Sequence, residues 1–555
     1  MKPIYEIFSY SDIKPFIAIL QEKEIVDKRS AQNEHFSYLA DYFRKIGVKT
    51  VLIEPEYVDR DYLEDYSRYY SKCFQKYSKW CTRIHFFNSS FTQEKFYKKL
   101  SSSDWATWTN NLQTSYLGFI VLRPIPKTLF GRICLTIYSE PGSFFPVLRE
   151  YKAHIMGIEL KVNTLACQEQ DNAISACATT ALWSAFQGTG KKTLQHTPSP
   201  YEITLNAKKV IGDSRSVFPN KGLLPSQMAY AVKEEELEPL MVQFSSTSYL
   251  KALLRAYLHV KVPVILGFTL RFENEEEGNF FDSKLRKRPI GDHAVTVTGY
   301  HLTSEIKAFN MASVSSHRPP KTKPMFLRSS GIDKIYVHDD QLGPFAQMTF
   351  RDEYWQHLTT EWYQYRPDKS QREQINATIK TILFPLYHKI RIRFNTIFLI
   401  IKDFHDYYTS MWSQLGCTIT WDIYLTTVCE LKKQILQIPI DVLCDKESRL
   451  KMLAYKMPRY MWVVDAYIQE DKKEKKLSFS FYFDATDIEN SDLFICALHY
   501  DREAYEIIHR EALIVHKNKI LQEDGTHNYQ ASKILSLYRE RNDNPQIIKP
   551  SLDPD

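Results

Sequence analysis

Three residues in the middle of the chain have the types and the order that nucleophilic catalysis requires. Cys177 follows a small, turn-prone stretch (171–176) and opens a segment in which small and apolar residues recur at helical spacing. We therefore expect this cysteine at a helix N-terminus, where the positive end of the helix dipole stabilises a thiolate, the nucleophilic form of the side chain. Taken alone, a free cysteine is equally well explained as a core residue, because this residue type is often buried.

His293 and Asp339 supply the other two groups. His293 stands at the head of an alternating strand in GDHAVTVTGYH, and Asp339 ends a short apolar strand in IYVHDDQLGPF. An imidazole can take the proton from the thiol, and a carboxylate can hold that imidazole in the productive orientation. Such partners meet in space, not in sequence. His338 is a rival imidazole. We expect His338 and Asp340 to face away from the site, because neighbouring strand residues point to opposite faces.

These three segments resemble the papain-like cysteine peptidases, most of all their bacterial C39-type branch. In that branch the cysteine opens a helix that continues T-A-L-W, the histidine begins an H-A-V-x-V-x-G-Y strand, and a D-P-x-x-G turn follows. The chain departs from the pattern in having Ala178 where glycine is frequent, Asp340 where proline is usual, and Asp171 where the oxyanion glutamine usually lies. The resemblance covers about the middle third of the sequence.

The resemblance implies a thiol hydrolase that cleaves a peptide or isopeptide bond through a thioester acyl-enzyme. Cys177 would be the nucleophile, His293 the base and Asp339 the orienting acid. Gln170, which we favour over Gln168, would complete the oxyanion hole with the backbone N–H of Cys177. This chemistry needs neither a metal nor an organic cofactor. Two alternatives stay open: acyl transfer to an amine, as in transglutaminases, and a papain-like scaffold that binds without catalysis.

Composition limits the setting in which such an enzyme would work. The 555 residues suggest two to four domains, and 44% hydrophobic with 25% charged residues is an ordinary globular composition. A net charge of +6 does not indicate nucleic-acid binding. The nine cysteines form no CxxC pair, and an odd number scattered over the chain is not a disulfide framework. The apolar runs are too short to cross a bilayer. We expect a cytoplasmic protein with a peptide or protein substrate. Regulation by a protein partner or by inserted loops is a further hypothesis.

The periodicity of the chain predicts an α+β protein in three parts. Residues 1–139 form a mixed α/β region, residues 140–367 a papain-like domain in which the nucleophile helix packs on an antiparallel sheet, and residues 368–555 a helical region with a β-meander. Two polar insertions, at 271–291 and 310–332, interrupt the central sheet and could gate or select substrates. The expected long helices cover 21–46, 59–79, 368–412 and 422–436.

Overall fold

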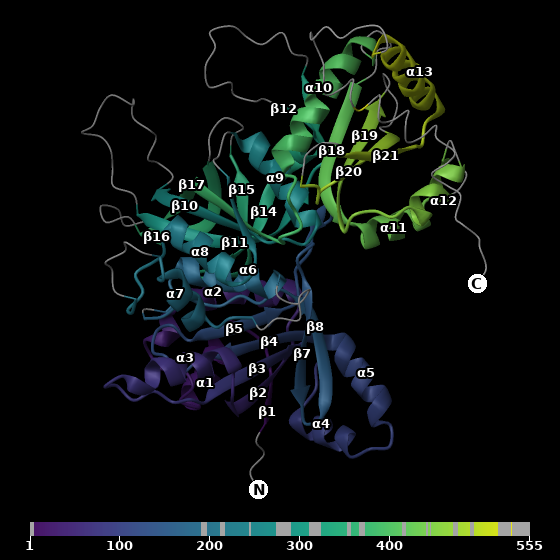
Figure 1. The fold of residues 1–555 in the computed structure, drawn as a ribbon. Coiled ribbons are helices and arrows are strands. Elements are labelled where there is room, and N and C mark those ends of the chain that lie inside the picture. The colour runs from purple at the N-terminus through teal and green to yellow at the C-terminus, as the bar shows by residue number, and fades with distance from the viewer. Residues whose placement is uncertain are drawn as a thin grey trace, which may run out of the picture. The chain divides into compact units, whose positions relative to one another are not determined.

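The structure is a computed structural model, and the chain forms two compact units (Figure 1). The structure describes residues 5–171, 173–189, 197–210, 217–242, 246–272, 290–309, 324–351, 357–365, 372–412, 418–439, 442–443, 446–469, 476–488, 493–519 and 534. The first unit contains residues 1–244, 261–301 and 333–385, and the second contains 245–260, 302–332 and 386–555. Residues 1–139 belong to the first unit together with most of the central region, and the predicted division into three parts stays a prediction.

The first unit begins with an antiparallel five-stranded sheet in chain order. Its strands are β1 (Glu6–Ser9), β2 (Thr50–Tyr57), β3 (Cys81–Phe87), β4 (Tyr116–Leu122) and β5 (Phe130–Leu135). Every residue of β4 is buried, as expected of a strand covered on both faces. The helices of this region are α1 (Ile13–Glu22), α2 (Glu34–Ile46), α3 (Arg60–Arg68), α4 (Gln93–Leu100) and α5 (Trp105–Ser115), and a hairpin of β7 (Arg149–Ile155) and β8 (Ile158–Thr164) follows.

Two predicted N-terminal helices are shorter than expected. The helix predicted over 21–46 is confirmed only from Glu34 to Ile46, because α1 ends at Glu22 and α2 starts anew after Asn33, whose side chain caps its first turn. The helix predicted over 59–79 ends at Arg68.

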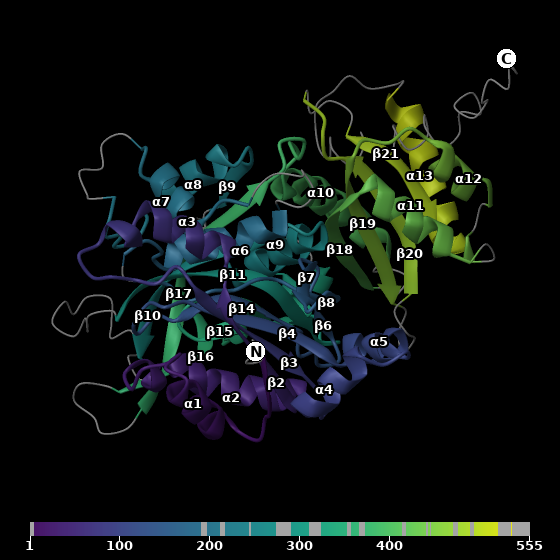
Figure 2. The same ribbon diagram turned by 90° about the horizontal axis from the view of Figure 1, so that it is seen from below.

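The second sheet of this unit closes on itself. Its strands are β10 (Val264–Phe272), β11 (Gly291–Leu302), β14 (Ile332–Asp339), β15 (Gly343–Phe350), β16 (His357–Tyr365) and β17 (Arg372–Leu386), in that order, and β17 pairs again with β10. The short strands β6 (Ser143–Phe144) and β9 (Glu238–Val242) pair at its margins. The helices α6 (Cys177–Thr189), α7 (Pro200–Ala207) and α8 (Pro225–Glu234) complete the unit. In both ribbon views α6 lies beside β11 (Figures 1 and 2).

Strand β17 contradicts the helix predicted over 368–412. Its β-branched residues Ile375, Thr378 and Ile379 belong to a burial pattern that alternates between core and surface, and β10 and β16 pair with its two edges. Among the described residues of that range, only α10 (Phe394–Trp412) is helical.

The second unit is built on the sheet β12 (Ala308–Phe309), β13 (Met325–Leu327), β18 (Thr418–Thr427), β19 (Tyr460–Gln469), β20 (Lys476–Asp484) and β21 (Phe494–His499). The predicted antiparallel meander is confirmed in β19, β20 and β21. The helix predicted over 422–436 starts late, since β18 occupies its first half and Thr427 caps α11 (Val428–Gln437). The other helices are α9 (Thr247–His259), α10, α12 (Lys446–Ala454) and α13 (Arg502–Lys519).

No helix in the described part of the chain is both long and apolar enough to span a membrane. The described cysteines, seven of the nine, are all free thiols. Both polar insertions lie largely outside the described residues, which resume at 290 and at 324.

Candidate active site

Cys177 is the first residue of α6, as the sequence predicts. It is partly exposed, whereas almost all of the helix behind it is buried. The loop before it is held by Asp171, whose carboxylate accepts hydrogen bonds from the backbone N–H groups of Ala173 (2.8 Å), Ile174 (2.6 Å) and Ser175 (3.2 Å). The residue in the position of the usual oxyanion glutamine therefore shapes the entry to the helix instead.

The helix α6 is fixed from two sides. The indole N–H of Trp183 donates to the Asp61 carboxylate at 3.0 Å, and the guanidinium of Arg132 donates to the same carboxylate at 2.7 Å. On the other side the hydroxyl of Thr296 in β11 donates to the carbonyl of Ala181 at 2.6 Å. Because α3, β5 and β11 all contribute, the N-terminal region is part of the scaffold that positions Cys177.

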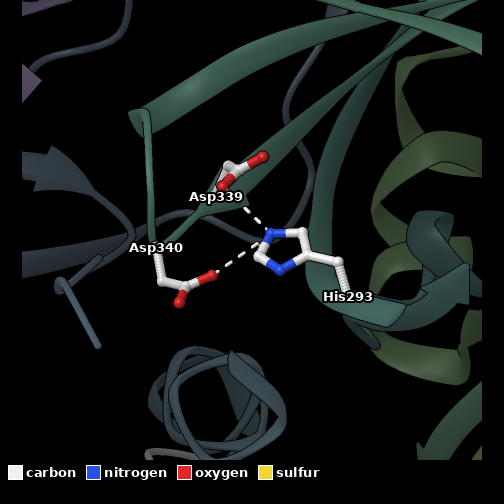
Figure 3. A group of neighbouring side chains, drawn as sticks. All are labelled: His293, Asp339 and Asp340. Atoms are coloured by element: carbon white, nitrogen blue, oxygen red, sulfur yellow. Dashed lines mark hydrogen bonds and ion pairs between the residues drawn. The ribbon is translucent and has the colours of Figure 1, made fainter. Parts of the chain in front are cut away.

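His293 lies in β11 and is buried, and its Nε2 donates to Asp339 Oδ1 at 3.1 Å (Figure 3). The same Asp339 oxygen accepts the backbone N–H of Gln341 at 3.0 Å, which holds the carboxylate in place. The Cys177 side chain is near enough to the imidazole to contribute to raising its pKa. In Figure 3, Nε2 faces the carboxylates and Nδ1 points away from them, so Nδ1 is the ring nitrogen that neither carboxylate engages. Cys177, His293 and Asp339 thus meet in one place.

Asp340 does not turn outward, so that prediction is wrong. It is buried, and its Oδ1 lies 3.3 Å from His293 Nε2 (Figure 3). The pairing of β14 with β15 shifts register between Val337 and Asp339, and Asp340 is already in the turn. At such an irregularity the two-residue alternation of side chains no longer applies. His293 therefore faces two carboxylates, and the donor atoms of the three side chains lie within 4.8 Å of one another.

The charges of His293, Asp339 and Asp340 depend on one another. Burial disfavours the imidazolium, but the carboxylates of Asp339 and Asp340 outweigh it and raise the pKa of His293 well above its ordinary value. Burial likewise opposes ionisation of Asp339, yet the charge and hydrogen bond of His293 hold its pKa below the usual range. Burial raises the pKa of Asp340 to about 7. Asp339 thus favours its ionised form beside the imidazole, whereas Asp340 favours its protonated form more than a free carboxyl does.

Two aromatic side chains flank the imidazole. The rings of His293 and Trp362 have centroids 5.1 Å apart and are inclined by 33°, and Phe268 meets His293 edge-on at 5.5 Å. Both aromatic residues are buried. They exclude water from the ring and its hydrogen bonds, which strengthens the electrostatic contacts there. No sequence pattern marks Trp362 or Phe268 for this position.

His338 is not available as a base. Its Nδ1 accepts the backbone N–H of Phe345 at 3.3 Å, so its Nε2–H donates to the carbonyl of Leu165 at 3.0 Å. Burial lowers the pKa of His338 to about 3, which keeps the ring neutral. The prediction that His293 is the imidazole of the site and that His338 faces elsewhere agrees with these contacts.

The two glutamines considered for the oxyanion hole differ in environment. Gln170, the favoured one, is partly exposed. Gln168 is buried, and its side-chain amide nitrogen has no hydrogen-bond partner among the described residues. A buried amide donor without an acceptor is rare and is suited to bind a group that arrives with the substrate. The oxyanion role of Gln170 stays a prediction, and Gln168 is the alternative whose amide nitrogen is buried without a described partner.

No protein-family model matches the sequence, and a comparison with curated proteins found no match.

Proposed function

We propose that this protein is a papain-like cysteine hydrolase that cleaves a peptide or isopeptide bond. The observation that carries the proposal is the placement of the His293 ring, which donates from Nε2 to Asp339 at 3.1 Å and whose pKa the nearby Cys177 side chain helps to raise. A nucleophile, a base and an orienting acid in this order have the geometry of a catalytic triad. A helix that begins at the nucleophile and packs on an antiparallel sheet carrying the other two groups also supports the papain-like comparison.

In the proposed reaction, His293 takes the thiol proton of Cys177 and the sulfur attacks the scissile carbonyl carbon. The carbonyl oxygen becomes an oxyanion, which the Cys177 backbone N–H and a glutamine amide stabilise. His293 then gives its proton to the leaving amine as the C–N bond breaks, leaving a thioester on Cys177. Water, deprotonated by His293, attacks the thioester and releases the carboxylic acid and the thiol. Asp339 keeps the ring oriented throughout.

A test of thiol activation does not require the substrate. Cys429 is a suitable internal control because it is exposed and also lies in the first turn of a helix, α11, but no imidazole contacts it in the described structure. We expect iodoacetamide near neutral pH to alkylate Cys177 faster than Cys429, although Cys177 is less accessible. His293→Ala should remove the difference. Equal rates at the two cysteines in the wild type would contradict thiol activation.

Hydrolysis itself can be tested with a peptide library prepared from a whole proteome. New N-termini detected by mass spectrometry with the wild type, and missing with Cys177→Ala, would identify cleavage and its specificity. Repeating the reaction with an added primary amine distinguishes hydrolysis from acyl transfer, since a transferase would yield amide products. An activated Cys177 together with neither product from peptides or from isopeptide-linked proteins would overturn the proposal.

A further inference from the structure

The orienting role in the proposed reaction belongs to Asp339, and the environment of Asp340 is unusual. Only 3% of the residue is exposed, and neither carboxylate oxygen has a hydrogen-bond partner in the described part of the chain. The single proton on His293 Nε2 is donated to Asp339, which also receives the N–H of Gln341. A buried carboxylate without a donor is strongly destabilising unless a proton or a cation neutralises it.

The three side chains are spaced as ligands of one ion. Nε2 lies 3.1 Å from the nearest Asp339 oxygen and 3.3 Å from the nearest Asp340 oxygen. Nitrogen and oxygen ligands bound about 2.1 Å from one metal ion lie about 3.0–3.4 Å from each other in octahedral or tetrahedral geometry. In Figure 3 both carboxylates approach the same edge of the imidazole, so that one ion could reach all three groups.

We propose that His293, Asp339 and Asp340 form a binding site for a divalent transition-metal ion such as Zn²⁺ or Mn²⁺. One imidazole nitrogen with two carboxylates is a donor set for ions of this class, and the two positive charges balance the two carboxylates. The surroundings favour binding too. The Gln341 N–H orients Asp339, and Trp362 and Phe268 fix the plane of the imidazole.

Metal binding would also inhibit the proposed enzyme. This inhibition rests on the proposed function, whereas the existence of the metal site does not. An ion on Nε2 replaces the proton there and leaves the remaining ring proton on Nδ1, the nitrogen that neither carboxylate engages. The ring can then no longer accept the thiol proton. The ion would hold the enzyme inactive, and its removal by a chelator would restore the base.

The site can be measured directly by adding Mn²⁺ to the full chain after treatment with a chelator and recording free Mn²⁺ by electron paramagnetic resonance. We expect one saturable site, from which Zn²⁺ displaces the Mn²⁺. Asp340→Asn should weaken binding about tenfold or more while leaving the His293–Asp339 hydrogen bond in place. Cys177→Ala should bind Mn²⁺ like the wild type, so the result does not depend on enzyme activity.

A matched control is Asp333→Asn. Asp333 forms a second histidine–aspartate pair, 2.7 Å from His301, but it is only partly buried and only one carboxylate takes part in that ion pair. Its loss should leave the binding curve unchanged. His293→Ala provides a second test if Asp340→Asn does not fold, as judged by circular dichroism. Absence of a saturable site in the wild type, or undiminished binding in both Asp340→Asn and His293→Ala, would show that Asp340 holds only a proton.

Discussion

The two carboxylates beside His293 should support the imidazolium jointly, and a double-mutant cycle can reveal this. The hydrogen bond from His293 to Asp339 is charge-assisted and buried, so its loss in Asp339→Asn should cost about 1.5–3 kcal/mol, or about 10- to 150-fold in thiolate formation. Asp340 lies 3.3 Å from the same nitrogen and can take over the charge. We therefore expect Asp339→Asn alone to reduce thiolate formation by about tenfold, at the low end of this range.

Asp340→Asn alone should slow the reaction less than Asp339→Asn, because the carboxylate that accepts the Nε2 proton is intact. The double variant Asp339→Asn/Asp340→Asn loses both carboxylates and should slow the reaction by more than the product of the two single effects. The assay is the rate of iodoacetamide alkylation at Cys177, followed by mass spectrometry in the presence of a chelator, with Cys429 as reference. Strictly multiplicative effects would refute shared support, and wild-type rates in all three variants would refute any role of the carboxylates in activating the thiol.

Three further outcomes follow from the same geometry. Cys177→Ala should abolish hydrolysis while leaving the melting temperature nearly unchanged, because the helix start tolerates a small residue; retained cleavage would exclude this nucleophile. Of Gln168→Ala and Gln170→Ala, the one that removes the oxyanion donor should lower turnover about 100- to 1000-fold without changing the alkylation rate, which involves no oxyanion. Burial lowers the pKa of His338 to about 3. As the pH falls below 6.5, the unfolded chain therefore binds a proton at this residue before the folded protein does, and protonation favours unfolding. The contribution of neutral His338 to stability is complete above pH 6.5 and is lost below it. The stability advantage of the wild type over His338→Gln should therefore shrink by up to about 1.4 kcal/mol per pH unit below 6.5; a constant difference between pH 7.5 and 4.5 would contradict this reasoning.

Local sequence patterns were sufficient for the elements that carry the site. A turn-prone stretch before alternating small and apolar residues predicted that a helix begins at Cys177, and α6 begins there. Alternation over 293–298 predicted the strand of His293, and the apolar run before Asp339 predicted the strand that ends with it. These features depend on periodicity and turn chemistry within about ten residues, which the sequence contains in full.

Features that depend on contacts between distant segments could not be predicted in this way. The side-chain direction of Asp340 is set by an irregular pairing of β14 with β15, and the strand β17 forms where β10 and β16 supply partners for residues that periodicity alone assigned to a helix. The positions of Trp362 and Phe268 beside His293 depend on three strands of the closed sheet. The sequence by itself determined which groups could react and which elements hold them. Only the tertiary structure decided that two carboxylates share one imidazole, because the pairing of β14 with β15 and the turn after Asp339 bring the second carboxylate back to the ring.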